Sequence, residues 1–125
     1  MMRPLVRALI SLAAGLAIIS VSGLVAARDQ QIVKTRIVAI VELPTEAKNT
    51  VALIKQGGPF PYAKDGTTFG NFEKRLPQRD RGFYKEYTVK TPGSRDRGAR
   101  RVVAARDGEF YYTDDHYNSF RRIKE

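Results

Sequence analysis

The stretch FYKEYTVKT, residues 83–91, is the clearest strand signal in the chain and decides its fold. Its aromatic and β-branched residues favour extended backbone, and Thr91-Pro92-Gly93 ends the strand. Successive side chains of a strand point to opposite faces, so Phe83, Tyr87 and Val89 share one face. The other face is expected to lie open to solvent or to a ligand, and it carries Tyr84, Glu86, Thr88 and Lys90.

Further strands are predicted on either side of this one. Residues 100–105 and 110–113 are rich in β-branched and aromatic side chains and flank the turn Arg106-Asp107-Gly108. Residues 119–123 predict a short last strand, and residues 67–69 predict a short extended piece. Residues 32–41 are either an early strand or a partly ordered lead-in. Successive strands joined by tight turns favour an antiparallel meander.

One amphipathic helix precedes these strands. The stretch LPTE, residues 43–46, is typical of a helix start, with Thr45 as the expected N-cap. Apolar residues then recur at helical spacing from Ala47 to Ile54, and Gly57-Gly58-Pro59 ends the helix. The predicted fold class is therefore α+β, with one N-terminal helix packed on an antiparallel β-sheet meander.

The first 27 residues are predicted to be a secretory signal peptide. Arg3 and Arg7 precede an uncharged run, residues 8–27, which ends in the small residues Val25-Ala26-Ala27. A basic region, an apolar region and a small-residue cleavage site are typical of such peptides. The alternative is an uncleaved membrane anchor, because about 20 apolar residues span a bilayer. We favour cleavage, so we expect a secreted, extracellular domain over residues 28–125.

The expected mature domain is strongly basic and has no cysteine. The whole chain has a net charge of +9, and without Arg3 and Arg7 it keeps 20 basic and 13 acidic residues, a net charge of +7. This charge favours a polyanionic partner such as nucleic acid, a membrane surface or an acidic polysaccharide, or it serves solubility alone. Because the chain has one histidine and no cysteine, we expect neither a metal nor a cofactor.

The single histidine, His116, is the side chain best suited to proton transfer near neutral pH. It follows the predicted strand 110–113, while Glu86 lies in the middle of the first strand described above. Neighbouring strands lie about 4.8 Å apart, so both groups can line one cleft with a nearby arginine. Arg100 and Arg101 point to opposite faces, so at most one of them joins Glu86. A base, an acid and cations are the groups needed to cleave a phosphodiester through a neighbouring 2′-hydroxyl.

A series of short motifs makes this interpretation more specific. In order along the chain they are GGPFPY (57–62), DG (65–66), FGNFE (69–73), LP (76–77), EYTV (86–89), TPG (91–93), RGARR (97–101) and YYTDDHY (111–117). The series resembles the secreted microbial guanyl-specific ribonucleases, most of all the streptomycete enzymes, and also barnase. The resemblance covers about residues 43–123 and implies the microbial ribonuclease fold.

The resemblance implies roles for the residues of the predicted cleft. Glu86 falls on the general base of the family and His116 on its general acid. Arg97 and Arg101 fall on the two phosphate-binding arginines. Lys85, beside the base, either adds positive potential for the phosphate or is an edge-strand lysine that discourages aggregation.

The resemblance also implies a guanine-recognition loop. Backbone N–H groups of this loop would meet guanine O6, and a carboxylate would accept from N1–H and the 2-amino group. Adenine lacks that pair of donors and would leave the carboxylate unpaired. The residues that fall on this site are Phe69, Gly70, Asn71, Phe72 and Glu73, with Tyr117 beside the base.

The chain departs from the family at three points. Members often carry arginine at the place of Phe72 and a polar side chain at the place of Gly70. Both changes predict that guanine is selected less strictly or held differently. The streptomycete enzymes also carry a disulfide that this chain lacks, as barnase does.

The activity that the resemblance implies is cleavage of single-stranded RNA on the 3′ side of guanosine. The expected product is a 2′,3′-cyclic phosphate, which is then hydrolysed to the 3′-phosphate. We expect a monomer with no stable membrane association after cleavage of the signal peptide, and a barstar-like acidic inhibitor as a partner. The main alternative is a non-catalytic secreted module that binds RNA or another polyanion. A further alternative concerns the biological role: the ribonuclease could serve as a toxin directed at competing cells.

Overall fold

The computed structural model describes residues 35–125, so the predicted signal peptide, residues 1–27, lies outside the described residues. One α-helix, one 3-10 helix and six strands follow in the order β1 (Arg36–Ala39), η1 (Ile40–Glu42), α2 (Thr45–Gln56), β2 (Thr67–Thr68), β3 (Tyr84–Thr88), β4 (Arg101–Ala105), β5 (Phe110–Thr113) and β6 (Arg121–Lys124). Within residues 35–125, no helix has the length and apolar character needed to cross a membrane.

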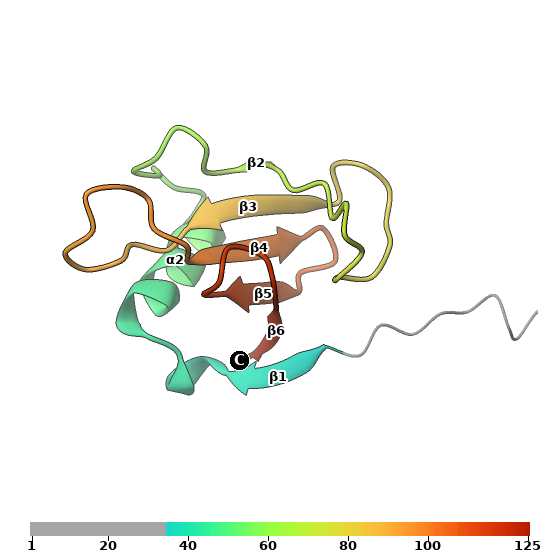
Figure 1. Ribbon diagram of the computed structural model, residues 1–125, viewed down its shortest axis with the longest axis horizontal. Helices are drawn as coiled ribbons and strands as arrows, with labels where there is room; N and C mark the ends of the chain where they lie inside the picture. Colours follow the sequence, from blue (N-terminus) through green and yellow to red (C-terminus); the bar gives the residue numbers. More distant parts are fainter. Residues whose placement is uncertain (1–34) are drawn as a thin grey trace, which may run out of the picture. The chain divides into compact units, whose positions relative to one another are not determined.

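The strands form one sheet in the order β1-β6-β5-β4-β3-β2. From β2 to β6 each neighbouring pair is antiparallel, which confirms the predicted meander. The early strand β1 adds to β6 in parallel at the far edge (Figure 1). A parallel pair needs a long connection, and here the helix and four strands supply it. The fold class is α+β, with one helix packed on a mixed sheet.

Helix α2 differs from the prediction at its first turn. Thr45 is the first helical residue and not the N-cap, because Pro44 occupies the cap position and no side chain caps the helix. Further along, the Thr50 hydroxyl lies 3.0 Å from the Glu46 carbonyl and 3.2 Å from the Thr88 carbonyl, so it links the helix to β3. Gly57, with φ 88°, ends the helix in the left-handed conformation as predicted.

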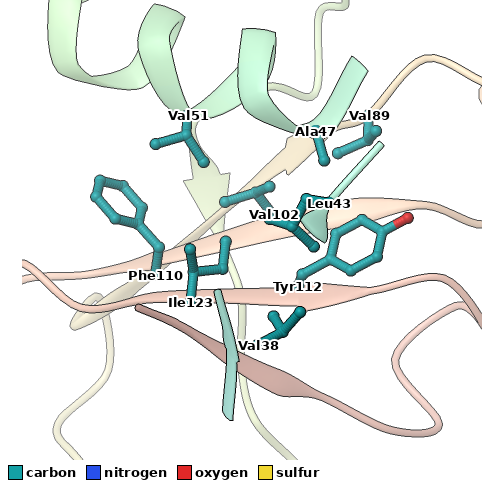
Figure 2. Close-up of a cluster of buried hydrophobic side chains, with 9 residues drawn as sticks. All are labelled: Val38, Leu43, Ala47, Val51, Val89, Val102, Phe110, Tyr112 and Ile123. Atoms are coloured by element: carbon teal, nitrogen blue, oxygen red, sulfur yellow. The ribbon is translucent and has the colours of Figure 1, made fainter. Parts of the chain in front are cut away.

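Two apolar clusters cover the two faces of the sheet. The first lies between α2 and the sheet (Figure 2) and comprises Val38, Leu43, Ala47, Val51, Val89, Val102, Phe110, Tyr112 and Ile123. The second lies on the other face and comprises Leu76, Tyr84, Val103, Tyr111 and Phe120. Val102 and Val103 are consecutive residues that are fully buried on opposite faces. Long loops must therefore cover the face of the sheet that has no helix.

The face of β3 that carries Glu86 is less open than the sequence predicts. Tyr84 is 3 % exposed and Thr88 is 5 % exposed, whereas Glu86 between them is partly exposed. The hydroxyl of Tyr84 donates to the carbonyl of Pro77 at 2.5 Å, so the loop before β3 covers that end of the strand. Solvent therefore reaches Glu86 only at the middle of β3, between the buried side chains of Tyr84 and Thr88.

Candidate active site

The register of β3 and β4 places Glu86 and Arg101 on the same face of the sheet. Glu86 lies opposite Val103, and Thr88 lies opposite Arg101, so all four side chains share that face. Arg100 points to the other face, where its Nη1 lies 3.8 Å from Glu46 Oε1 of the helix. The prediction that at most one of these two arginines shares a face of the sheet with Glu86 is confirmed, and that arginine is Arg101.

The loop after β3 brings Arg97 onto the carboxylate of Glu86. Arg97 Nη2 lies 3.1 Å from Glu86 Oε1, and Arg97 Nε lies 3.0 Å from the hydroxyl oxygen of Thr88. Both side chains are mostly buried. The carboxylate and the guanidinium therefore sit side by side in a fixed geometry.

Arg101 is a buried cation that organises the same loop. It is only 3 % exposed, and its Nη1 donates to the carbonyls of Arg100 at 2.7 Å and Gly98 at 2.9 Å. Its Nε is buried and has no hydrogen-bond partner within residues 35–125. Buried donors are nearly always paired in native proteins. This donor is therefore left unsatisfied by the residues that the structure describes, and Arg101 itself lies beneath the surface of the cleft.

His116 lies on a strained turn that packs against the arginine loop. Its φ is 53° and that of Tyr117 is 72°, both in the left-handed region that costs non-glycine residues about 1–3 kcal/mol. The backbone N–H of His116 donates to the carbonyl of Ala99 at 2.9 Å. The general-acid candidate is thus attached to the loop that carries Arg97, and its imidazole is exposed to solvent.

Asp115 holds this turn together, a contribution that the sequence analysis missed. Its carboxylate accepts from Ser119 Oγ at 2.6 Å, from Ser119 N at 2.9 Å and from Thr113 Oγ1 at 2.8 Å. Burial acts to raise the pKa of Asp115, but the hydrogen bonds from Ser119 and Thr113 outweigh it and hold the pKa below its ordinary value. An acid followed by serine four residues later is the only sequence signal for this arrangement.

The pKa of Asp115 predicts how the turn responds to acid. A carboxylate with a lowered folded pKa adds stability above its unfolded pKa, and that stability is lost as pH falls through the folded pKa. Asp115→Asn is therefore expected to lower Tm at pH 7, with the difference from wild type closing as pH falls below the ordinary aspartate pKa of about 3.9 and then through the lower folded pKa. Thermal unfolding followed by circular dichroism tests this. Asp114→Asn, whose carboxylate is exposed and pairs with Arg121, is the control with a smaller change. A Tm difference for Asp115→Asn that stays constant with pH would contradict the assignment.

The predicted guanine loop and the acid–base pair line one cleft. Its volume is about 370 Å³, and its wall includes Glu86, His116, Tyr117 and all five loop residues Phe69, Gly70, Asn71, Phe72 and Glu73. Arg97 does not line the cleft but contacts Glu86, which does. Arg101 likewise lies behind the wall, with its guanidinium 6.0 Å from the ring of Tyr117. Lys85 does not line the cleft itself, but its Nζ lies 3.4 Å from the hydroxyl of Thr68, which does.

Asn71 and Arg75 set the shape and charge of the loop. Asn71 has φ 52°, and its side-chain amide exchanges two hydrogen bonds with the backbone of Leu76, at 2.8 and 3.0 Å. This side chain therefore fixes the bend of the loop. The carboxylate of Glu73 is 70 % exposed and pairs with Arg75, a partner that the sequence analysis did not identify.

The two unusual residues of the loop, Gly70 and Phe72, depend on each other. Phe72 is 84 % exposed, and its ring folds back over Gly70. A Cβ atom on Gly70 would lie 2.5 Å from a carbon of that ring, which is closer than real Cβ contacts allow. The absence of a side chain at Gly70 is what makes room for the aromatic ring in this position.

Tyr117 joins the aromatic wall of the cleft to its charged groups. Its ring stacks on Phe69 with centroids 5.0 Å apart and packs against the ring of His116 at 4.9 Å. Burial, together with the charge of Glu86, raises the pKa of Tyr117 to about 12. The hydroxyl therefore stays protonated at neutral pH and remains a hydrogen-bond donor. Within residues 35–125, no three histidine or carboxylate side chains cluster as metal ligands would.

A carboxylate, an imidazole and two guanidinium groups beside an aromatic cleft define a site for phosphodiester cleavage, and comparison with known proteins agrees. The chain belongs to the ribonuclease family, whose model matches residues 26–124. It is 56 % identical over 84 residues to guanyl-specific ribonuclease St of Saccharopolyspora erythraea, which covers 67 % of this chain and 83 % of that protein. It is 48 % identical over 89 residues to guanyl-specific ribonuclease Sa of Kitasatospora aureofaciens, covering 70 % and 93 % respectively.

Solved structures support the same relationship. Ribonuclease Sa2 in complex with mononucleotides is 48 % identical, with a TM-score of 0.73, over 74 % of this chain and 96 % of that one. Ribonuclease Sa2 with guanosine-2′-cyclophosphate is 47 % identical, with a TM-score of 0.70, over 73 % and 97 %. The expected family and fold are therefore confirmed.

Proposed function

We propose that the protein is a guanyl-specific endoribonuclease that cleaves single-stranded RNA on the 3′ side of guanosine. The observation that carries this proposal is the shared cleft, in which Glu86 and His116 lie beside the loop of residues 69–73. The guanyl specificity of the related ribonucleases supports it further. The uncharged run after Arg3 and Arg7 supports secretion of the enzyme.

The first step forms a cyclic phosphate. Glu86, ionised, takes the proton of the 2′-hydroxyl, and the 2′-oxygen attacks phosphorus. The bond from phosphorus to the 5′-oxygen breaks, and His116, protonated, gives its proton to that leaving oxygen. The positive charges of Arg97 and Arg101 stabilise the negative charge on the phosphate during this transfer.

The second step hydrolyses the cyclic phosphate with the two roles exchanged. His116, now neutral, takes a proton from water, and the water oxygen attacks phosphorus. Glu86, now protonated, returns its proton to the 2′-oxygen as that bond breaks. The product is the guanosine 3′-phosphate, and both groups regain their starting protonation.

Guanine is selected by the loop of residues 69–73. The carboxylate of Glu73 accepts from N1–H and the 2-amino group, while backbone N–H groups of the loop donate to O6. Arg75 already pairs with Glu73, and both residues line the cleft. Adenine has no such pair of donors and would cover the Glu73 carboxylate without pairing it. An acceptor left unpaired in this way costs more binding free energy than one ordinary hydrogen bond contributes.

Dinucleotide cleavage tests this proposal. The protein, with a chelator present, is incubated with GpU, ApU, CpU and UpU, and we expect cyclic guanosine phosphate to dominate. Sites that hydrogen-bond their substrate reject analogues without the donors by up to about 10⁴–10⁵ in kcat/KM. The deoxy dinucleotide dGpU, which has no 2′-hydroxyl, is the control and is not cleaved. Salt-sensitive RNA binding without any product would instead indicate the non-catalytic polyanion-binding module.

A further inference from the structure

A second cavity lies on the other side of the guanine loop from the catalytic groups. It has a volume of about 410 Å³ and shares the loop residues Phe69 to Phe72 with the first cleft. Its remaining wall comes from the segment before β3 and includes Lys74, Gln78, Arg79 and Arg81. We call it the basic groove. No role in the proposed reaction requires it.

The basic groove carries an excess of positive charge. Lys74, Arg79 and Arg81 face one carboxylate, that of Asp80. Within residues 35–125, none of these three cations lies within 4.0 Å of a carboxylate oxygen. Unpaired cations around a concave surface create a positive potential that attracts anions.

Arg79 is held in place before any ligand binds. Its Nη1 donates to the carbonyl of Gln78 at 2.9 Å, and its guanidinium lies 5.5 Å from the ring of Phe83. Arg106 covers the same ring at 5.7 Å. Packing on an aromatic ring restricts the arginine, so less side-chain freedom is lost when it contacts a phosphate.

Strand β3 gives the direction in which a bound RNA runs. Tyr84 lines the basic groove, Glu86 lines the catalytic cleft, and Thr88 holds Arg97, and the three alternate along one face of the strand. Figure 1 shows the loops before and after β3 at opposite ends of that strand. The groove, the guanosine and the scissile phosphate therefore follow one another in that order. Because the scissile phosphate leaves guanosine on its 3′ side, an RNA that continues past the guanine loop, away from that phosphate, does so with its 5′ portion.

We propose that the basic groove binds the nucleotides that precede the guanosine, an inference that rests on the proposed function. Lys74, Arg79 and Arg81 contact the phosphate on the 5′ side of the guanosine. Phe72, whose exposed ring lines both cavities, offers a stacking surface to the preceding base. Stacking of this kind tolerates any base, because every base has a π-face. The groove therefore adds affinity for longer substrates without adding sequence specificity.

Oligonucleotides extended on one side only test this inference. GpU, the 5′-extended UpUpGpU and the 3′-extended GpUpUpU each contain one cleavable site, and the two longer ones have equal length and charge. For wild type we expect a higher kcat/KM on UpUpGpU than on GpU. In the double variant R79Q/R81Q this gain falls by roughly fivefold, as for the loss of two exposed ion pairs, while GpU cleavage is unchanged. The variant R36Q/K124Q, at the far edge of the sheet, removes the same charge and keeps the gain.

Salt dependence supplies a second readout. For single strands, log affinity falls with log salt with a slope of about 0.7 for each phosphate contacted. The slope for UpUpGpU is expected to be steeper than that for GpU in wild type, and the difference shrinks in R79Q/R81Q.

Three results would count against the proposed role of the basic groove in binding the preceding nucleotides. If wild type cleaves GpU but gains nothing from the 5′ extension, this inference fails and the proposed function stands. If R79Q/R81Q lowers kcat/KM on GpUpUpU as much as on UpUpGpU, the two arginines provide a general positive potential and do not bind the nucleotides that precede guanosine. If wild type does not cleave GpU at all, the proposed function fails and the inference fails with it.

Discussion

Glu86→Gln and His116→Ala are each expected to lower kcat for GpU cleavage by about 10²–10⁴, the range that one acid or base contributes. The glutamine is nearly the same size as Glu86 and can still accept the hydrogen bond of Arg97, but it cannot take a proton at neutral pH. The imidazole of His116 is exposed, and the turn is held by the backbone and by Asp115, so alanine removes the acid and leaves the turn in place.

The pH profile separates the two roles in this first prediction. Wild-type activity needs an ionised Glu86 and a protonated His116 together, so kcat/KM is expected to follow a bell-shaped curve. Glu86→Gln loses the acidic limb of that curve, and His116→Ala loses the alkaline limb. Asp114→Asn, on the same turn as His116, is the matched control and keeps both limbs. Activity of either variant within threefold of wild type would show that the acid and the base have been assigned wrongly.

Arg101→Met is expected to give the second large effect, a loss of about 10²–10³ in kcat/KM, which is typical when one preorganised transition-state donor is removed. Methionine fills much of the buried space but has no donor for the phosphate. The variant is also expected to be less stable, by roughly 1–3 kcal/mol, because the carbonyls of Gly98 and Arg100 lose their donor. Steady-state kinetics on GpU and chemical denaturation measure the two losses separately.

Phosphate binding distinguishes a phosphate-binding role of Arg101 from a purely structural one. A ligand that binds only the folded state raises Tm, so inorganic phosphate is expected to raise Tm of wild type but not of Arg101→Met. Arg100→Met is the control, because that neighbouring side chain points to the helix face and pairs with Glu46. If phosphate stabilises Arg101→Met as much as wild type, Arg101 is only a scaffold for its loop.

The central strands were predictable because their patterns are local. Residues 110–113 were predicted at the observed bounds of β5, and strand alternation alone separated Arg100 from Arg101. The parallel pairing of β1 with β6 was not predictable, because each pair joins residues 85 positions apart in the chain, such as Arg36 and Arg121. The burial of Tyr84 and Thr88 also depends on loops from elsewhere, which no alternation pattern contains. Thr45 failed as an N-cap because the chain enters the helix directly from the fixed φ of Pro44.

The candidate site, like the fold, has one part that the sequence predicts and one part that depends on packing. The motif series placed Glu86, His116 and the guanine loop, and the structure brings these residues to one cleft. The pairing of Glu73 with Arg75 and the unused Nε of Arg101 are properties of side-chain packing. They could not be read from residue types, because each depends on where several loops meet.

The contact between Phe72 and Gly70 has an evolutionary consequence, namely that the residue at position 70 decides where the ring at position 72 lies. With the ring in its present place, any side chain at position 70 must first displace it, because a single added Cβ already collides with the ring. Glycine at 70 therefore permits the present ring position, and because the ring of Phe72 is 84 % exposed, a side chain at 70 would turn the ring aside and change the wall of the cleft. The pair is a case of epistasis in a recognition loop, and the effect of changing either residue depends on the identity of the other.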